Sequence, residues 1–339
     1  MRFAWVLLIL LPAAPCIAAW TEIESVKDPC RAASLNVTFT AGDFLDDGRR
    51  GWVVGTYRGE DGRRLAVLRT TDGAHSWTAT WTNIDVIPAT RVDFIDATHG
   101  WLLAGDSPIY RTDDGGRSWE AEQVANREYA LKNMRMTGAR QGFAVGSVWG
   151  TSRAALFDYR PADGEWRQVC TGDPGLISAL AVQRPAGVWA AGRSDEGDYL
   201  SFRWHVGAAE WLPMTIPSQV SALSFPSGSQ GWAACTSGRV FATDDEGVTW
   251  REQATPILSD VGDILISSAR TGMALAPGGG ITLRTSDGGE NWAVEHAPEN
   301  AQRLLWDGGR YLALSPTSLF AYELVARTIP SVQPLQRRE

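Results

Sequence analysis

The chain has 339 residues, of which 44% are hydrophobic and 16 are tryptophan, and its formal net charge is −8. It carries 31 Lys and Arg against 39 Asp and Glu, so the composition argues against a nucleic-acid-binding protein, which would show a basic excess. The length suits one large domain or two ordinary ones, and the high tryptophan content indicates a fold that uses this residue repeatedly.

The chain begins with the features of a secretory signal peptide. Arg2 supplies a positive charge, residues 3–11 form an apolar run, and Ala18 and Ala19 form a small-residue cleavage site. We therefore predict a signal peptide over residues 1–19 and export to the periplasm or the cell exterior. Cys16 does not fit a lipidation site, because Pro15 precedes it and no Leu lies three positions upstream.

Three cysteines remain after the signal peptide: Cys30, Cys170 and Cys235. They allow at most one disulfide within the chain, and the sequence leaves open whether any pair forms or all three are buried thiols. No CxxC motif and no Cys/His spacing points to a metal site, so we expect neither a metal nor a cofactor.

A motif with the pattern Thr-x-Asp-x-Gly/Ala-x-Ser/Thr/Asn-Trp occurs four times, at residues 69–77, 111–119, 242–250 and 284–292. Two weaker copies, at 158–166 and 203–211, keep the tryptophan and lose the aspartate. We expect each aspartate to accept backbone hydrogen bonds in its own turn, each glycine to take a positive φ, and each tryptophan to cover apolar surface. The residues given this structural role are Asp72, Trp77, Asp114, Gly116, Trp119, Asp245, Gly247, Trp250, Asp287, Gly289 and Trp292.

A second motif, a glycine with a short apolar run, recurs seven times from residue 51 to residue 309, at intervals of 37 to 49 residues. Units of this length are typical of the four-stranded blades of a propeller. In the fifth unit, residues 220–225, 231–235, 239–243 and 250–254 read as strands a to d, separated by Gly, Ser and Pro clusters.

The last unit lacks a tryptophan-led outer strand, and the stretch WTEIESV at residues 20–26 can supply it. We predict an all-β fold, a seven-bladed β-propeller over residues 20–326 whose last blade is closed by the N-terminal strand. A polar tail follows at residues 327–339. A strand added from the other end of the chain would leave the ring without an open edge.

These repeats resemble the Asp-box, or BNR, repeat of sialidases and other propellers. The seven-unit layout, the glycine-tryptophan second strands and the N-terminal strand are most similar to the photosystem II stability/assembly factor family. This resemblance covers almost the entire mature chain and implies a non-catalytic, exported, monomeric platform. Its partner would be a protein, such as a membrane-protein complex under assembly, and not a nucleic acid.

The alternative is a sialidase-like or other glycoside hydrolase, or a carbohydrate-binding propeller. Sialidases resemble one another in a Phe-Arg-Ile-Pro motif, an arginine triad and a Tyr/Glu nucleophile pair. The first blade has no such arginine motif, and the only adjacent Tyr-Glu, Tyr322 and Glu323, falls in the third strand of the last blade. We therefore assign no catalytic residue.

Binding chemistry is expected in the turns between strands b and c, which lie together on one face of a propeller. Arginines there could form a local positive site for an acidic partner, or Glu60, Asp61, Asp195, Glu196 and Asp198 could neutralise them. Trp149 lies in such a turn, as an interface anchor or folded over the channel mouth. The candidate partner-binding residues are Arg58, Arg63, Arg64, Trp149, Arg153, Arg193 and Arg239.

Overall fold

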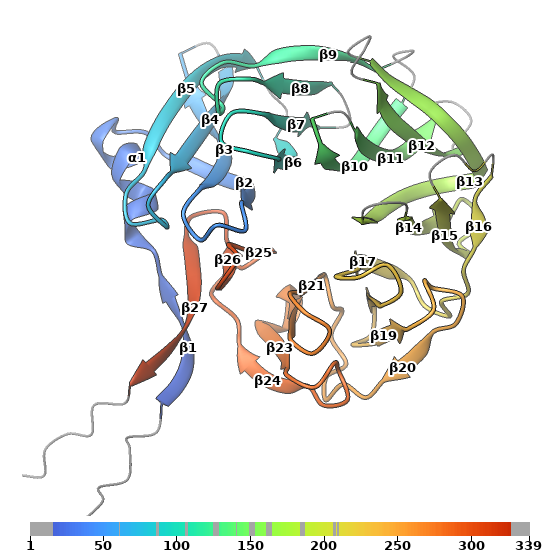
Figure 1. Cartoon of the computed structure of the whole chain (residues 1–339). Helices are drawn as coiled ribbons and strands as arrows, with labels where there is room; N and C mark the ends of the chain where they lie inside the picture. The colour runs from blue at the N-terminus through green and yellow to red at the C-terminus, as the bar shows by residue number, and fades with distance from the viewer. Residues whose placement is uncertain are drawn as a thin grey trace, which may run out of the picture.

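The computed structural model describes residues 16–326 apart from 61, 86–87, 106–107, 125–128, 140, 149–152, 161–164, 184–186, 206–207 and 209. Its strands form a ring of seven blades around a central channel (Figure 1), so the predicted propeller is confirmed. Strand a of each blade lines the channel, and strand d lies at the rim. The predicted tail, residues 327–339, lies outside the described residues.

The blades follow one another in chain order. Blade 1 consists of β2 (Val37–Phe44), β3 (Gly51–Gly59), β4 (Gly62–Thr70) and β5 (Thr78–Asp85). Blade 2 consists of β6 (Ala89–Phe94), β7 (Gly100–Ala104), β8 (Ile109–Thr112) and β9 (Glu120–Val124). Blade 3 consists of β10 (Tyr129–Gly138), β11 (Gln141–Val148), β12 (Arg153–Arg160) and the first part of β13 (Glu165–Gln183). Blade 4 consists of the rest of β13, β14 (Gly187–Ser194), β15 (Tyr199–His205) and β16 (Leu212–Pro213).

Blades 5 to 7 complete the ring. Blade 5 consists of β17 (Val220–Ser224), β18 (Gly231–Cys235), β19 (Val240–Thr243) and β20 (Arg251–Gln253). Blade 6 consists of β21 (Asp263–Ile266), β22 (Gly272–Ala276), β23 (Ile281–Thr285) and β24 (Ala293–His296), with the 3-10 turn η2 (Pro277–Gly279). Blade 7 consists of β25 (Arg303–Trp306), β26 (Tyr311–Leu314), β27 (Leu319–Ala326) and, from the other end of the chain, β1 (Cys16–Glu22).

Blades 2, 3 and 4 share one 11-stranded sheet, whereas each of the other four blades is a separate 4-stranded sheet. The reason is β13, which runs without a break from the rim of blade 3 to the channel wall of blade 4. At the rim, β13 also pairs in parallel with β9 through Trp166 and Val124. Blades 3 and 4 are the two whose repeats lack the aspartate.

The ring closes where β1 pairs antiparallel with β27, in the register Trp20 opposite Tyr322, so the predicted closure by the N-terminal strand is confirmed. The bounds predicted for that strand, residues 20–26, are wrong. β1 ends at Glu22, and the chain then forms the 3-10 helix η1 (Glu24–Lys27) and the helix α1 (Asp28–Ala32). Pro29 lies in the first turn of α1, where its missing N–H costs no hydrogen bond, and Val26 is fully buried.

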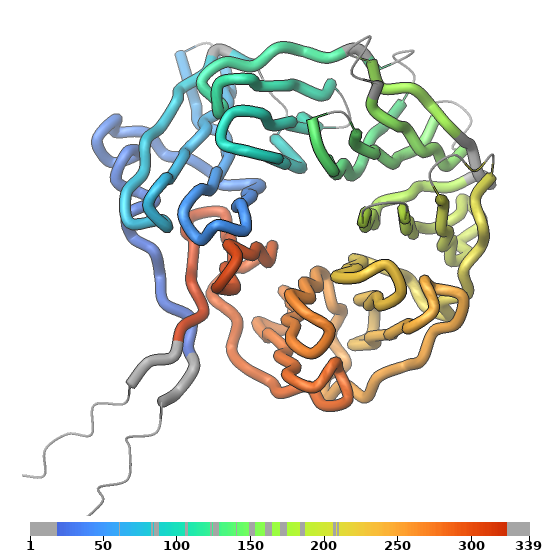
Figure 2. The backbone as a smooth tube through the Cα atoms, viewed as in Figure 1, coloured from blue at the N-terminus to red at the C-terminus, as the bar shows by residue number. Residues whose placement is uncertain are grey.

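The two ends of the chain therefore lie side by side (Figure 2). Beyond Ala321, β27 pairs only with β1, so the two strands leave the ring as a ribbon. Blade 7 also contacts blade 1 directly, because the Phe39 N–H donates to the carbonyl oxygen of Pro316 at 2.8 Å and Arg310 Nη2 donates to that of Gly73 at 3.1 Å. Closure thus depends on more than one strand pair.

Tryptophan residues join neighbouring blades. Trp52 of β3 stacks on Phe94 of blade 2 with ring centroids 3.7 Å apart, and its Nε1 donates to the carbonyl oxygen of Gly115 at 3.0 Å. Trp189 of blade 4 stacks in the same way on Phe225 of blade 5. A buried indole adds about 2–3 kcal/mol through apolar burial. Apolar burial explains why the sequence repeats this residue, because the Nε1 atoms of Trp101 and Trp232, at the positions equivalent to Trp52, are buried without an acceptor among the described residues.

The turns from strand c to strand d show the hydrogen bonding of the repeated aspartate in detail. Asp114 Oδ1 accepts from the N–H groups of Arg117 and Ser118 at 2.8 and 2.9 Å, and Oδ2 accepts from Ser118 Oγ at 2.6 Å. Gly116 has a φ of +86°, which a side chain would strain. The two contacts to the fourth residue after the aspartate recur in the turns at Asp72, Asp245 and Asp287.

This hydrogen bonding makes the turn sensitive to acid. Burial alone would raise the pKa of Asp114, but the hydrogen bonds from Ser118, Thr112 and Arg117 lower it to about 2. A carboxylate whose folded pKa lies below its unfolded value, about 3.9, stabilises the protein fully above that unfolded value. The contribution is lost as the pH falls toward 2.

Asp114→Ala should lower the free energy of unfolding by about 1–3 kcal/mol, because two backbone N–H groups lose their acceptor. Thermal or urea unfolding at neutral pH measures this. Asp113→Ala is the matched control, since Asp113 is exposed and, among the described residues, its carboxylate contacts the side chains of Arg111 and His99 and no backbone N–H. Equal stability of the two variants would refute the structural role of Asp114.

A protein that begins at Lys27 should be less stable than one that begins at Trp20 by about 3 kcal/mol or more. It loses the rest of β1 and the buried Val26, and it exposes the edge of β27. Thermal unfolding and light scattering after size exclusion report the loss and the resulting association. A protein without residues 327–339 is the control and should match the full mature chain. A monomeric protein from Lys27 with unchanged unfolding would mean that β1 is dispensable.

Candidate functional site

The turns of the propeller fall on two faces. The b–c face carries the turns between strands b and c and the links from one blade to the next, and the c–d face carries the a–b and c–d turns. Arg58, Arg63 and Arg64 lie at the ends of β3 and β4, Arg153 starts β12, and Arg193 lies near the end of β14. The topology therefore places them, together with Arg239, on the b–c face of blades 1, 3, 4 and 5.

Arg58 and Arg63 face each other directly across the β3–β4 pair, and both are exposed. Like charges in this position repel each other. Within the described ranges, neither side chain forms a hydrogen bond or an ion pair. They line a shallow groove with Asn36, Thr38, Tyr57 and Glu60, so this groove presents two guanidinium groups that form no ion pair with a described residue, next to hydroxyl, amide and carboxyl groups. The prediction that Arg58 and Arg63 lie in a turn is wrong, because β3 ends at Gly59 and β4 begins at Gly62, so both arginines belong to strands.

The other arginines differ in how they are held. Arg153 and Arg193 are exposed, and Arg64 is half-buried. Arg193 Nε donates to the carbonyl oxygen of Gly197 at 3.1 Å within its own hairpin. Arg193 is thus anchored by one hydrogen bond, and its side chain remains exposed.

Arg239 is held in the sheet. Its Nε and Nη2 donate to the two carboxylate oxygens of Glu252 at 2.7 and 2.8 Å, and Nη1 donates to the carbonyl oxygen of Pro217 at 2.8 Å. The guanidinium group also lies 4.8 Å from the ring centroid of Phe241. The hydrogen bonds from Arg239 lower the pKa of Glu252. These contacts leave Arg239 few donors for a partner.

Trp149 lies outside the described residues, so neither of the two roles considered for it can be assigned. The side chain of Cys170 is also outside them. Cys30 and Cys235 are buried free thiols, so these two do not form a disulfide with each other.

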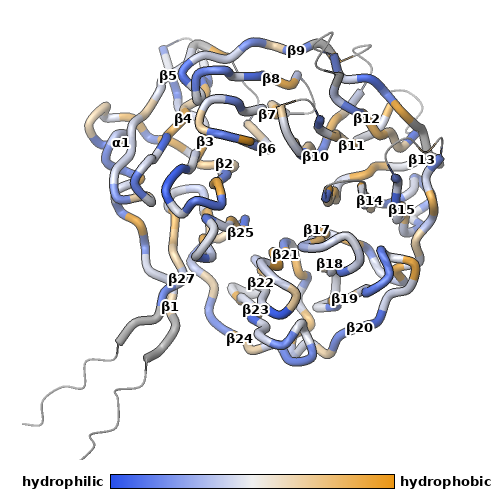
Figure 3. Tube along the Cα trace, viewed as in Figure 1, coloured by the Kyte–Doolittle hydropathy of each residue, from blue (hydrophilic) through white to orange (hydrophobic). Residues whose placement is uncertain are grey.

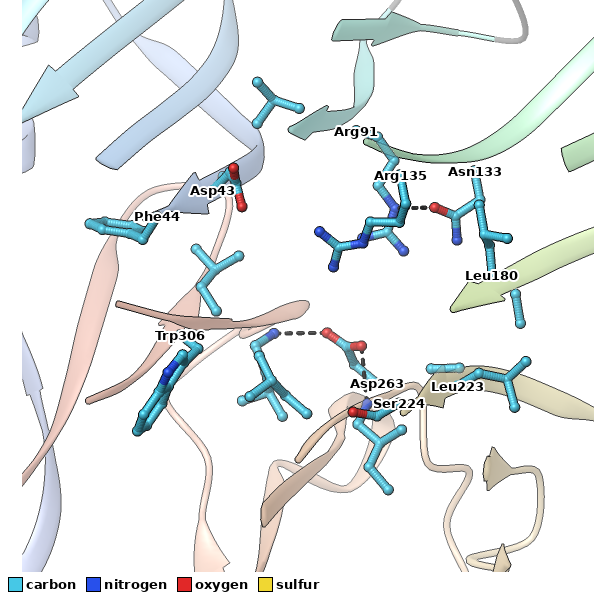
Figure 4. A pocket seen from close by; sticks show the side chains of 18 of the residues that line it. Asp43, Phe44, Arg91, Asn133, Arg135, Leu180, Leu223, Ser224, Asp263 and Trp306 are labelled. Carbon is cyan, nitrogen blue, oxygen red and sulfur yellow. Dashed lines mark hydrogen bonds between the residues drawn. The ribbon is translucent and has the colours of Figure 1, made fainter. Parts of the chain in front are cut away.

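The wall of the central channel carries charged residues that the sequence analysis did not select. Arg91, Asp93, Arg135, Asp43 and Asp263 lie on strand a of blades 1, 2, 3 and 6. Four of them line a cavity of about 250 Å³, together with Asn133 (Figure 4). Figure 3 shows hydrophilic and hydrophobic residues alternating along the strands around this channel. That alternation was the available signal, since Arg91 and Asp93, or Asn133 and Arg135, are two residues apart and face the same side of a strand.

No group of three or more His, Cys, Asp and Glu side chains gathers closely enough to hold a metal ion among the residues that the structure describes. Over the same residues, no helix has the length and apolar character needed to cross a membrane. Tyr322 lies in β27, the third strand of blade 7, and donates a hydrogen bond to Glu295 at 2.6 Å. Burial, together with that bond, raises the pKa of Tyr322, which is unfavourable for a phenolate nucleophile.

The chain is similar in sequence to photosystem II assembly factors, although no protein-family model matches it. It is 26% identical over 319 residues to the photosystem II assembly lipoprotein Ycf48 of Picosynechococcus, covering 88% of this chain and 87% of the relative. It is 23% identical over 312 residues to the photosystem II stability/assembly factor HCF136 of Arabidopsis thaliana, covering 84% and 72%. It is 24% identical over 264 residues to Ycf48 of Thermosynechococcus vestitus, covering 63% and 75%.

Solved structures agree on the fold. YCF48 from Cyanidioschyzon merolae superposes with a TM-score of 0.68 at 18% identity, covering 92% of this chain and all of that one. YCF48 bound to D1 peptide superposes with a TM-score of 0.69 at 16% identity, covering 91% and 99%. The resemblance inferred from the repeats is confirmed: this chain is similar in sequence and in fold to the photosystem II stability/assembly factor propellers.

Proposed function

We propose that the chain is an exported, non-catalytic propeller that binds a protein partner through the arginines of its b–c face and serves as an assembly platform. The observation that carries this proposal is the pairing of Arg58 with Arg63 in the groove of blade 1. Two facing guanidinium groups repel each other, and neither forms an ion pair with a described residue, so an acidic segment of a partner would offset that repulsion. Arg153 and Arg193 extend the positive surface to blades 3 and 4.

The relatives support a binding role. They are assembly factors, and one structure holds YCF48 bound to D1 peptide. A peptide that binds along a propeller face needs no catalytic group. Tyr322, from the one adjacent Tyr-Glu pair in the sequence, lies in the third strand of blade 7, away from the b–c arginines of blades 1, 3, 4 and 5.

Export is the second part of the proposal. It rests on the leader at residues 1–19, and some relatives are named lipoproteins. Cleavage after Ala19 would leave Trp20, Thr21 and Glu22 paired with β27, so the mature propeller of residues 20–326 would keep its closing strand. The polar tail at residues 327–339 follows it.

Charge reversal of the b–c face should weaken binding of a D1 peptide used as a probe. We expect the variant with Arg58→Glu, Arg63→Glu and Arg193→Glu to bind about tenfold or more weakly at low salt, because exposed charges steer association and salt screens them over about 8 Å. Fluorescence anisotropy at several ionic strengths measures the Kd.

The control reverses three exposed arginines that belong to the c–d face, Arg49, Arg251 and Arg270, and so makes the same change in net charge. It should bind like the wild type, and both variants should unfold like it. Equal weakening in the two variants would show an effect of net charge alone. Hydrolysis of a fluorogenic sialoside by the wild-type protein would favour the glycoside hydrolase alternative.

A further inference from the structure

The cavity in the central channel is distinct from the arginines of the b–c face. It is bounded by the inner strands of all seven blades, and its volume of about 250 Å³ suits a small group and not a folded element. In Figure 4, Arg91 and Arg135 come from neighbouring strands and extend into this space, while Asp43 and Asp263 lie across it. Which of these charges is available to a ligand follows from their hydrogen bonds.

The carboxylates of the channel are engaged by backbone N–H groups. Asp43 Oδ2 accepts from the N–H of Phe94 at 2.7 Å, and Asp263 Oδ2 accepts from that of Leu304 at 2.8 Å. Asp93 accepts from the N–H of Met136 in the same way. In each case a carboxylate on strand a of one blade accepts a hydrogen bond from a backbone N–H on strand a of the next blade. These acids therefore hold neighbouring blades together, and each commits one carboxylate oxygen to that bond.

The two channel arginines, in contrast, use few of their hydrogen-bond donors. Within the described part of the chain, the only hydrogen bond of Arg91 runs from Nε to Asn133 Oδ1 at 2.8 Å, which leaves both terminal amino groups without a partner. Arg135 has one contact, from Nη1 to Asp93 Oδ1 at 3.4 Å, and its side chain is 46% exposed to the channel. A guanidinium group has five donors in a planar fork, so most donors of this pair face the cavity.

The electrostatic environment supports the same view. Burial, and then repulsion from Arg303 and Arg135, lower the pKa of Arg91, whose guanidinium group remains charged at neutral pH. Burial and repulsion from Asp93 raise the pKa of Asp43, which reduces the negative charge that opposes the arginines. Positive charge near Arg91 is thus incompletely compensated, and a bound anion would compensate it.

We propose that the central channel binds a small oxyanion, a carboxylate or a phosphate, between the guanidinium groups of Arg91 and Arg135. The planar forks suit the paired oxygens of these groups. Asn133 fixes Arg91 from behind through its side-chain oxygen and is itself held, because its Nδ2 donates to the carbonyl oxygen of Ser178 at 3.0 Å. The site does not depend on the proposed peptide-binding role of the b–c face.

Titration calorimetry with acetate and with inorganic phosphate tests this site. We expect saturable binding of at least one anion to the wild type. Arg91→Gln and Arg135→Gln should each weaken it about ten- to a hundredfold, since each removes charged hydrogen bonds to the ligand. Arg193→Gln, a change on the b–c face, is the matched control and should bind like the wild type. Arg91→Lys and Arg135→Lys keep the charge without the fork and should give intermediate affinity.

Two peptides of the same sequence, one ending in a free carboxylate and one in an amide, distinguish the source of the anion. Binding of acetate or phosphate assigns the site to a free anion. Binding only of the peptide with the free carboxylate, lost in Arg91→Gln, assigns it to the end of a chain. Absence of binding by all four probes to the wild type would overturn the proposal. So would unchanged affinity in both Gln variants, once circular dichroism confirms that they are folded.

Discussion

β1 and β27 come from opposite ends of the chain, and their antiparallel pairing gives blade 7 its outer strand. Every other blade draws its strands from one continuous segment, so this strand pair, together with the direct hydrogen bonds between blades 7 and 1, converts a row of blades into a ring. A closed ring fixes the separation of the inner strands, and short side chains such as Asp43 and Asp263 can then reach the backbone of the next blade. The faces and the channel depend on that closure because both are built from several blades at once.

The inner strands combine two roles in alternating positions. Carboxylates and Ser224 bind the next strand a, with the Ile266 N–H donating to Ser224 Oγ at 3.0 Å, while Arg91 and Arg135 point into the cavity. The arginines of the b–c face differ in the same way. Arg239 donates hydrogen bonds to Glu252 and Pro217, whereas Arg58 and Arg63 form none with the described residues. Arginines at related positions thus differ in role. Those whose donors are used within the fold stabilise it, and those whose donors are unused can bind a ligand.

The blade count, the strand positions in blade 5 and the closing strand could be predicted from sequence, because each blade repeats the same turn and the same glycine-led strand. The helix at Asp28–Ala32 could not, since five residues are too few for a periodic pattern. The continuous β13 was also missed, because weak repeats gave no boundary there. The arginines of the b–c turns were selected by residue type, but only contacts distinguish Arg239 from Arg58. Arg91 and Arg135 were not predicted as binding residues, because they lie within strands and binding residues were expected only in turns.

Hydrogen–deuterium exchange of the mature protein, with and without bound D1 peptide, tests most directly whether the b–c face is the binding surface. Peptide binding should slow exchange in segments of the b–c face, namely residues 56–64 and 192–198, because a docked chain covers their backbone N–H groups. The turns at residues 72–77, 114–119 and 287–292 on the c–d face should be unchanged. Slowed exchange confined to those c–d turns, with residues 56–64 and 192–198 unaffected, would contradict the account.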